Sequence, residues 1–291
     1  MIYDLISIGS ITKDIFLLTD RGKVFKTPKD KLAPEWLGFE LGEKICVSEI
    51  IENIGGVAAN LSIGTKKFGL KSTPIGPVKA AASIIIVDKK TGERVIFYKK
   101  SSGNINLKKL KKMKTKWLSV SSLTGNWNRQ TDIILNYIER EKAKLIVAPS
   151  TSMIQEGFKN LKKLLAQAEI IFLNKNEAIE IISKLKNKFK NNNYLPKYLL
   201  KYLHNLGPEI VCLTDGKRGA YCSKNQKIYY SPIKKVKTVD VTGAGDAFAS
   251  GFLGFYLKGA SIEKSLAMGI KNSANVVRFI GTTKGLLADK L

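Results

Sequence analysis

The stretch VDVTGAGDAFASGF, residues 239–252, is the part of the sequence that says most about the fold. It has the pattern of an extended segment, a glycine-bearing turn and an apolar helix that runs through Tyr256. Gly243 and Gly245 permit a close backbone approach that a Cβ would block. The N–H groups at the helix start lack partners and, together with the helix dipole, favour an anion. Asp246, in the first turn, either complements the dipole or acts as a base beside an anion-binding loop.

Length and composition indicate an ordinary globular protein. The chain has 291 residues, of which 44% are hydrophobic and 25% are charged. This is enough for one large α/β domain or two smaller ones. No run of about 18 apolar residues occurs, so we expect no membrane span. The N-terminal residues resemble a strand and not a signal peptide, which predicts a cytoplasmic protein.

Cysteine and histidine usage excludes several kinds of chemistry. Cys46, Cys212 and Cys222 form no CxxC pair, and His204 is the single histidine. A zinc site built from cysteine and histidine is therefore disfavoured, and so is Ser-His-Asp or Cys-His catalysis. We expect His204 near the end of a helix. The chemistry must then depend on carboxylates, amides, hydroxyls and backbone groups.

The net charge of +25 raises the question of a nucleic-acid partner. The excess is mostly lysine and is spread along the chain, with its densest run at residues 108–116. That run lacks the arginines and interleaved aromatic residues typical of nucleic-acid readers. We therefore expect a solvated surface that attracts anionic substrates, and no nucleic-acid partner.

Strand-like and helix-like segments alternate from Trp117 onward. This rhythm predicts a parallel sheet with helices on both faces, and no linker divides the chain into two domains. Residues 84–87 and 94–98 form a β-hairpin pattern. Together with strand-like residues 15–18 and 44–52, they predict a small β-sheet that acts as a lid, drawn from about residues 15–52 and 84–98.

Polar residues and glycines follow the first predicted strands. Asp14 comes after a strand that ends at Gly9, and is either a turn aspartate or a ligand contact at the carboxyl edge of the sheet. Gly55 and Gly56 precede an alanine-rich helix, where they form a plain turn or let a ligand lie against bare backbone. Asn60, one turn inside that helix, can hydrogen-bond a hydroxyl.

Two further motifs follow later strands. Asn174 and Glu177 come after IIFL, and Thr214 and Gly216 come after IVCL. Both motifs therefore open onto the same carboxyl edge as Asp246. Asn and Glu oxygens there can hold the water shell of Mg²⁺ or cap a helix. The Thr-x-Gly pair can contact phosphate or form a turn.

In this order, the motifs GSxxxD, GGxxxN, NxxE, TxGxxG and DxTGAGDxFxxGF resemble the ribokinase-like (PfkB) family of carbohydrate and nucleoside kinases. The last motif is specific, and the series covers almost the whole chain. The resemblance implies one ribokinase-like domain over residues 1–291, an α/β fold with a central, mostly parallel sheet flanked by helices and a small β-sheet lid. It implies ATP-dependent phosphorylation of a hydroxyl on a small sugar, ribose- or fructose-like, or on a nucleoside. Mg²⁺ and a homodimer formed through the lid are also implied.

The resemblance gives roles to individual residues. Asp246 matches the base that takes the proton from the acceptor hydroxyl. The positions that match the anion hole are Gly243, Ala244 and Gly245. The positions that match nucleotide and water-mediated Mg²⁺ binding are Asn174, Glu177, Thr214, Gly216 and Gly219. The positions that match acceptor contacts are Asp14, Gly55, Gly56 and Asn60. The positions that match a monovalent-cation site, for an ion such as K⁺, are Asp240 and Thr242.

One segment departs from the family pattern. After residues 72–79 the family continues with a Gly-Asp loop, a helix and a strand, but here residues 80–83 lead directly into the hairpin. One αβ unit is absent after Lys79. This leaves a second hypothesis, a catalytically weakened ligand-binding or regulatory relative, which the intact Asp246 and NxxE motif disfavour. A P-loop kinase is disfavoured because GxxxxGK[ST] is missing, and a dinucleotide-binding fold because Phe248 replaces the third glycine.

Overall fold

A computed structural model describes residues 2–26, 35–78, 81–91, 93–99, 104–185 and 194–288. Its largest element is an eight-stranded sheet in the order β14-β13-β12-β11-β10-β9-β1-β6. The strands are β1 (Ile2–Ile8), β6 (Ser72–Ile75), β9 (Lys114–Val120), β10 (Lys144–Val147), β11 (Ala168–Asn174), β12 (Ile210–Thr214), β13 (Ala220–Lys224) and β14 (Lys227–Ser231).

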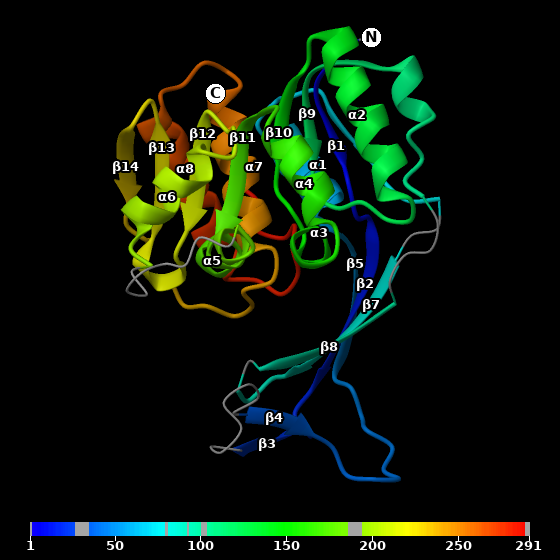
Figure 1. The fold of residues 1–291 in the computed structure, drawn as a ribbon. Coiled ribbons are helices and arrows are strands. Elements are labelled where there is room, and N and C mark those ends of the chain that lie inside the picture. Colours follow the sequence, from blue (N-terminus) through cyan, green and yellow to red (C-terminus); the bar gives the residue numbers. More distant parts are fainter. Residues whose placement is uncertain are drawn as a thin grey trace.

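The strands from β12 to β6 pair in parallel, while β13 pairs antiparallel with both β12 and β14. The predicted mostly parallel sheet is therefore confirmed. Because parallel strands share one direction, they all end at the same edge, which is the lower edge of the main body in Figure 1.

Helices cover both faces of this sheet (Figure 1). One face carries α1 (Val57–Lys67), α7 (Ala244–Tyr256) and α8 (Ile262–Val276). The other carries α2 (Trp127–Glu141), α3 (Thr151–Gln155), α4 (Phe158–Leu165), α5 (Lys175–Ser183) and α6 (Pro196–His204). In β11, Ile170 and Phe172 pack toward α7 and α8, whereas Ile171 and Leu173 pack toward the opposite helices. Alternate side chains of each buried strand thus build two hydrophobic cores.

A second sheet projects from the carboxyl edge of the first (Figure 1). Its order is β5-β2-β7-β8, formed by β5 (Glu49–Gly55), β2 (Thr12–Thr19), β7 (Ala81–Asp88) and β8 (Arg94–Lys99). β7 and β8 pair antiparallel, as the hairpin pattern predicted. Phe16, Leu18, Ile85 and Val87 form a small core on its inner face.

Local details differ from the expectations. Asp14 lies within β2, where it pairs with β5 and β7 and is not in a turn. Residues 44–48 form no strand, although the Ser48 N–H still donates to the Leu18 carbonyl oxygen of β2 at 2.8 Å. Two further strands, β3 (Lys23–Lys26) and β4 (Glu35–Gly38), pair as a separate antiparallel hairpin.

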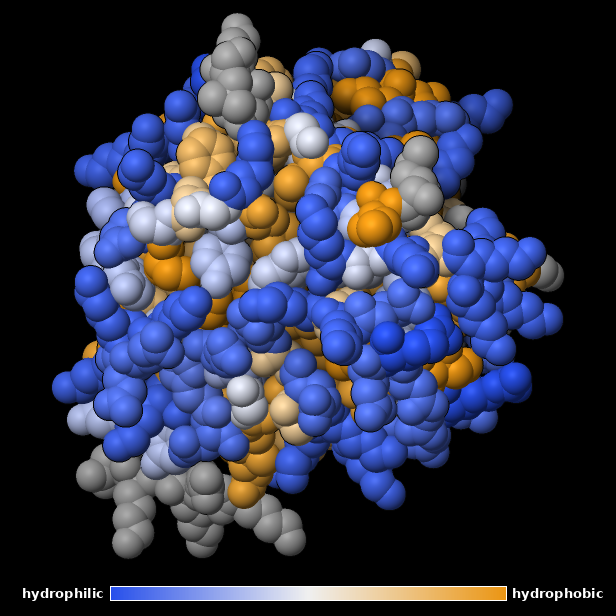
Figure 2. All heavy atoms as spheres, turned by 90° about the horizontal axis from the view of Figure 1, so that it is seen from above, coloured by the Kyte–Doolittle hydropathy of each residue, from blue (hydrophilic) through white to orange (hydrophobic). Residues whose placement is uncertain are grey.

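Strand β6 lies at the open edge of the main sheet, and residues 76–80 separate it from β7. Lys79 and Ala80, where we expected the chain to depart from the family pattern, lie outside the described residues. Figure 2 shows a face covered mainly by hydrophilic side chains, as the lysine-rich composition predicts. Within the described ranges, no helix is long and apolar enough to cross a membrane.

Candidate active site

The turn that precedes α7 has the predicted glycine geometry at Gly243 but not at Gly245, where a Cβ would meet nothing within 4 Å. Gly243 caps the helix with φ 76°, in the left-handed region that favours glycine. A Cβ on Gly243 would lie 2.8 Å from Cβ of Thr282. The N–H of Ala244 donates to the Val241 carbonyl oxygen at 3.2 Å, and among the described residues it is the predicted anion-hole group with an internal acceptor. The positive end of the α7 dipole lies at this turn.

Asp246 lies in the first turn of α7 and is hydrogen-bonded to a residue 186 positions away. Nδ2 of Asn60 donates to Oδ2 of Asp246 at 2.7 Å, and Oγ1 of Thr282 donates to Oδ1 of Asn60 at 2.9 Å. Burial raises the pKa of Asp246 to about 6, and the Asn60 bond opposes that rise. A carboxyl with this pKa suits general-base chemistry near neutral pH. The sequence analysis did not identify Thr282 as a site residue, because no motif around it indicates a contact with Asn60.

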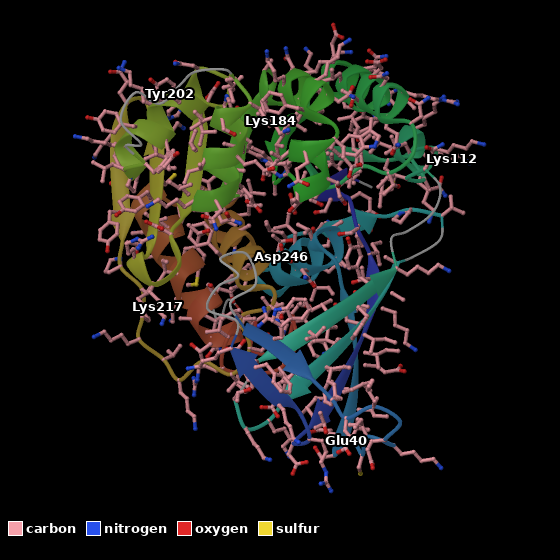
Figure 3. The ribbon with its side chains drawn as sticks, turned by 60° about the horizontal axis from the view of Figure 1, so that its bottom comes forward. Glu40, Lys112, Lys184, Tyr202, Lys217 and Asp246 are labelled. Atoms are coloured by element: carbon pink, nitrogen blue, oxygen red, sulfur yellow. The ribbon has the colours of Figure 1, made fainter. Side chains whose placement is uncertain are left out.

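A cavity of about 280 Å³ opens beside Asp246. Five predicted residues line it, from the ends of β11 and β12, from α5 and from α7: Asn174, Glu177, Thr214, Gly245 and Asp246. Apolar side chains of Leu61, Phe172 and Phe248 form part of its wall. Figure 3 shows Asp246 toward the centre of the molecule, while Lys112, Lys184 and Lys217 lie at the periphery. The cavity thus combines a few polar groups with an apolar wall, as ligand sites commonly do.

Asn174 and Glu177 form a capping box at the start of α5. Oδ1 of Asn174 accepts the Glu177 N–H at 2.9 Å, and Oε2 of Glu177 accepts the Asn174 N–H at 2.8 Å. Burial raises the pKa of Glu177, and the nearby Asp246 charge adds to the rise. Helix capping and cavity lining therefore coexist in this pair. The sequence alone left helix capping and the binding of hydrated Mg²⁺ as alternatives, and the structure shows the cap.

The loop after β12 carries Thr214, Gly216 and Gly219. Gly216 and Gly219 have φ values of 53° and 91°, so both take conformations that favour glycine. Asp215, which follows Thr214 directly, was not selected in the sequence analysis. Arg218 donates to both oxygens of Asp215 at 2.8 and 2.7 Å, and Lys175 lies 3.5 Å away. These cations hold the pKa of Asp215 below its usual range.

The predicted acceptor contacts lie where the second sheet meets α1. Asp14 is 6% exposed, and a Cβ on Gly55 would overlap its carboxylate. Gly56 caps α1 with φ 89°, and a Cβ there would lie 2.5 Å from the Ser10 carbonyl oxygen. Both glycines therefore permit close packing. Asn60, one turn further, is 3% exposed and bonds to Asp246, not to the cavity surface.

Asp240 and Thr242 hydrogen-bond to each other ahead of the Gly243 turn. The N–H and Oγ1 of Thr242 donate to Oδ1 of Asp240 at 2.9 and 2.6 Å. Asp240 is 3% exposed and also lies 3.5 Å from a guanidinium nitrogen of Arg94 on β8. The sequence analysis did not identify Arg94.

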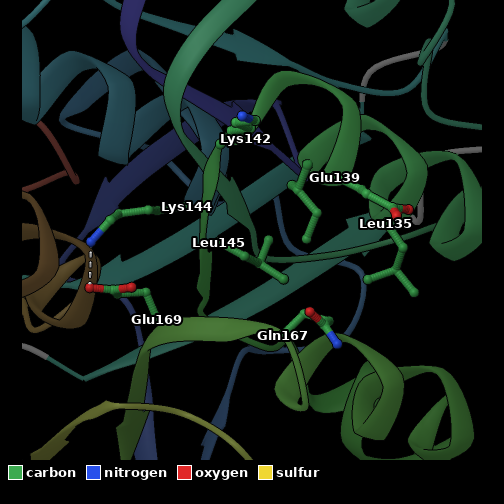
Figure 4. Close-up of a pocket in the computed structure, with 9 residues that line it drawn as sticks. Leu135, Glu139, Lys142, Lys144, Leu145, Gln167 and Glu169 are labelled. Carbon is green, nitrogen blue, oxygen red and sulfur yellow. Dashed lines mark hydrogen bonds and ion pairs between the residues drawn. The ribbon is translucent and has the colours of Figure 1, made fainter.

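A larger hollow of about 600 Å³ lies at the opposite, amino edge of the main sheet (Figure 4). Residues near the starts of β10 and β11 line it, and Lys144 pairs there with Glu169 at 2.8 Å. None of the predicted site residues lines this hollow. Ligands of α/β sheets bind at the carboxyl edge, so the cavity beside Asp246 is the candidate active site.

Comparison with known proteins identifies the family of the chain. The sequence pattern of the pfkB family carbohydrate kinases matches residues 79–289. The chain is 28% identical over 297 residues to an ATP-dependent 6-phosphofructokinase of Thermoanaerobacterium thermosaccharolyticum, covering 96% of this chain and 89% of that protein. It is also 28% identical over 150 residues to a cytidine kinase of Thermococcus kodakarensis, about half of each chain.

Solved structures show the same fold. A probable sugar kinase from Rhizobium etli has a TM-score of 0.73 at 18% identity, covering 98% of this chain and 96% of that one. The nucleoside kinase of Methanocaldococcus jannaschii, an archaeal member of the ribokinase family, has a TM-score of 0.69 at 20% identity, with 98% and 95% covered. The predicted ribokinase-like fold is therefore confirmed. The chain belongs to the pfkB family of carbohydrate kinases and is a sugar or nucleoside kinase, a phosphotransferase with an alcohol group as acceptor.

Proposed function

We propose that this protein transfers the γ-phosphoryl group of ATP to a hydroxyl of a small sugar or nucleoside, with Asp246 as the general base. The observation that carries the proposal is the place of Asp246. It lies in the first turn of α7, lines the 280 Å³ cavity, and accepts a hydrogen bond from Asn60 at 2.7 Å. A raised pKa of about 6 leaves the carboxylate mostly ionised at pH 7 while giving it more basicity than a free aspartate.

In the proposed step, one oxygen of Asp246 takes the proton of the acceptor hydroxyl. The acceptor oxygen then bonds to the γ-phosphorus, and the bond from that phosphorus to the β–γ bridging oxygen breaks, which releases ADP. The Asn60 amide orients the carboxylate and leaves its second oxygen for the acceptor. Such a step depends mainly on position and on charge stabilisation.

The turn at Gly243–Gly245 supports charge stabilisation at the phosphoryl group. N–H groups in the first turn of a helix lack intrahelical acceptors, and the α7 dipole adds positive potential there. Gly245 lines the cavity beside Asp246, and a Cβ there would meet nothing within 4 Å. We propose that the Gly243 and Gly245 N–H groups act first, and that Ala244 joins them only by exchanging its 3.2 Å bond to Val241.

We further propose that Asn174 and Glu177 hold Mg²⁺ through its water shell. Among the described residues, no cluster of three or more His, Cys, Asp or Glu side chains could form a direct metal cage. The pair nevertheless lines the cavity with amide and carboxylate oxygens, which suit a hydrated Mg²⁺. When bound, the ion would neutralise charge on the ATP phosphates. Thr214, Gly216 and Gly219 would contact the nucleotide on the same side.

The acceptor would bind where Asp14, Gly55 and Gly56 meet the start of α1. The buried Asp14 carboxylate can accept hydrogen bonds from sugar hydroxyls, and the two glycines bring backbone close to it. A ribose- or fructose-like sugar or a nucleoside fits this chemistry. The phosphofructokinase and cytidine kinase relatives represent both acceptor classes.

An ATP-consumption screen tests the proposal. Purified protein with Mg²⁺ and ATP is offered ribose, fructose, fructose 6-phosphate, cytidine and adenosine, and ADP release is measured. We expect release with one acceptor class and none without acceptor. ATP binding without turnover on any of these compounds would instead support the catalytically weakened, ligand-binding alternative.

We also propose that the protein forms a homodimer through the outer face of the second sheet, the face opposite Phe16. Strand register places Ile50, Ile54, Ile84 and Phe97 on this face, and they are 60, 59, 43 and 58% exposed. Exposed apolar side chains gathered on one face of a sheet often mark an interface. Sedimentation velocity should give a dimer for the wild type and a monomer for Phe97→Lys. The matched change Ile228→Lys, on β14 of the main sheet, should leave the dimer intact. A monomeric wild type at micromolar concentration would contradict the proposal.

A further inference from the structure

Asp240 is an acidic side chain almost completely removed from solvent, and it lies three residues before the Gly243 turn. Its side chain is 2% exposed. Oδ1 accepts the N–H and Oγ1–H of Thr242, and Oδ2 accepts the N–H of Gly281 at 3.1 Å. These bonds attach the segment before α7 to the segment after α8. The carboxylate therefore fixes the backbone from which the anion-hole turn begins.

A buried carboxylate needs a compensating positive charge. Arg94 supplies one, with a guanidinium nitrogen 3.5 Å from Oδ1 of Asp240 and a side chain 25% exposed. Arg94 is the first residue of β8, and its register opposite Val87 places it on the inner face of the second sheet. The charge partner of Asp240 thus comes from the second sheet, whereas Asp240 itself lies in the segment before α7.

The residues around Asp240 do not fit a monovalent cation. Such an ion needs oxygen lone pairs directed at it, but both oxygens of Asp240 already accept N–H or O–H groups. An ion at Oδ1 would also share that oxygen with the guanidinium of Arg94 and repel it. Asp240 therefore has a positive charge partner and three hydrogen-bond donors without a bound K⁺.

We infer that Arg94 takes the place of a monovalent cation beside the anion-hole turn, so that this kinase works without K⁺. Arg94 is then a positioning residue, since it acts on the Gly243 turn through Asp240 and Thr242. It also links the second sheet to the catalytic turn, because the charge reaches Asp240 only when the inner face of β8 lies against it. The inference rests on the proposed kinase function.

The test compares salts at one ionic strength, with KCl against choline chloride. For the wild type, kcat should differ by less than about twofold between the salts, since no cation site remains to fill. Arg94→Ala should lower kcat about tenfold or more in choline chloride, as expected when a buried carboxylate loses its charge partner. Added guanidinium or K⁺ should restore part of that loss. The control Arg21→Ala removes an exposed arginine paired with Asp20 at 3.9 Å and should behave like the wild type.

Thermal unfolding gives a readout that does not depend on turnover. The wild-type Tm should be the same in KCl and in choline chloride, and Arg94→Ala should gain stability specifically from K⁺. Activation of wild-type kcat by K⁺, or a wild-type Tm that rises only in KCl, would overturn the inference even if the variant fails to fold. Full activity of Arg94→Ala in choline chloride would do the same. A salt-independent wild-type Tm with no turnover on any acceptor would reject the proposed function and leave the role of Arg94 standing.

Discussion

Replacing Asn60 should shift the pH dependence of the reaction, because Asn60 is the residue that opposes the raised pKa of Asp246. Burial raises this pKa to about 6, and the 2.7 Å bond from Nδ2 of Asn60 lowers it. A hydrogen bond to a charged group contributes about 1.5–3 kcal/mol. One pKa unit corresponds to about 1.4 kcal/mol, so loss of the bond should raise the pKa of Asp246 by about 1–2 units.

In Asn60→Leu, the ionised fraction of Asp246 at pH 7 should fall from about nine-tenths to between about one-half and one-tenth. The direction of the pH dependence follows from the role of the base, because Asp246 must be ionised to accept a proton. The rate should therefore rise with pH, and the midpoint of that rise should move from about 6 to about 7–8.

The assay is kcat/KM from pH 5 to 9 by coupled ADP release, since this ratio reports pKa values of the free enzyme. Thr282→Val is the matched control. It removes the bond to Oδ1 of Asn60 but leaves the Nδ2 donor on Asp246, so its midpoint should stay near that of the wild type. If Asn60→Leu lowers the maximum of kcat/KM but keeps the midpoint near pH 6, the claim that the Asn60 bond lowers the pKa of Asp246 is refuted.

Three further predictions follow from the same geometry. Glu177→Gln should raise the Mg²⁺ concentration needed for half-maximal rate several-fold, which a Mg²⁺ titration would measure. The Gln side chain can still accept the Asn174 N–H that caps α5, so the Tm should stay close to that of the wild type. Gly243→Ala should lose kcat and about 1–2 kcal/mol of stability from its left-handed φ, whereas Gly259→Ala, also left-handed but with open space around it, should lose stability alone. Asp246→Asn should raise the free energy of unfolding at pH 8 by about 1–3 kcal/mol. The raised pKa means that protonation stabilises the wild-type fold as pH falls from about 6 to 4, so the difference should vanish below pH 4 in unfolding curves.

The main sheet was predictable from sequence because its signals are local. Buried parallel strands such as Ile170–Leu173 read as apolar runs, and the helices between them carry apolar stripes. The sharing of one carboxyl edge then follows from parallel topology alone. That is why the sequence alone predicts that Asn174, Thr214 and Asp246 lie near one another.

Contacts between distant segments were not predictable in this way. The bonds from Asn60 to Asp246, from Thr282 to Asn60, and from Arg94 to Asp240 join residues 146 to 222 positions apart. No periodicity or turn rule encodes such pairs, because they depend on how the second sheet and the segment after α8 pack against α7. The position of Asp14 inside β2 depends likewise on strand partners far along the chain.

The most direct test of the central claim is the turnover of Asp246→Asn with ATP, Mg²⁺ and the acceptor found in the screen. Asparagine keeps the size of the side chain and can still accept the Asn60 bond, but it cannot take a proton. We expect kcat to fall by about a hundredfold or more while the Kd for ATP, measured by calorimetry, stays within about twofold. Wild-type turnover in Asp246→Asn would contradict the assignment of Asp246 as the base.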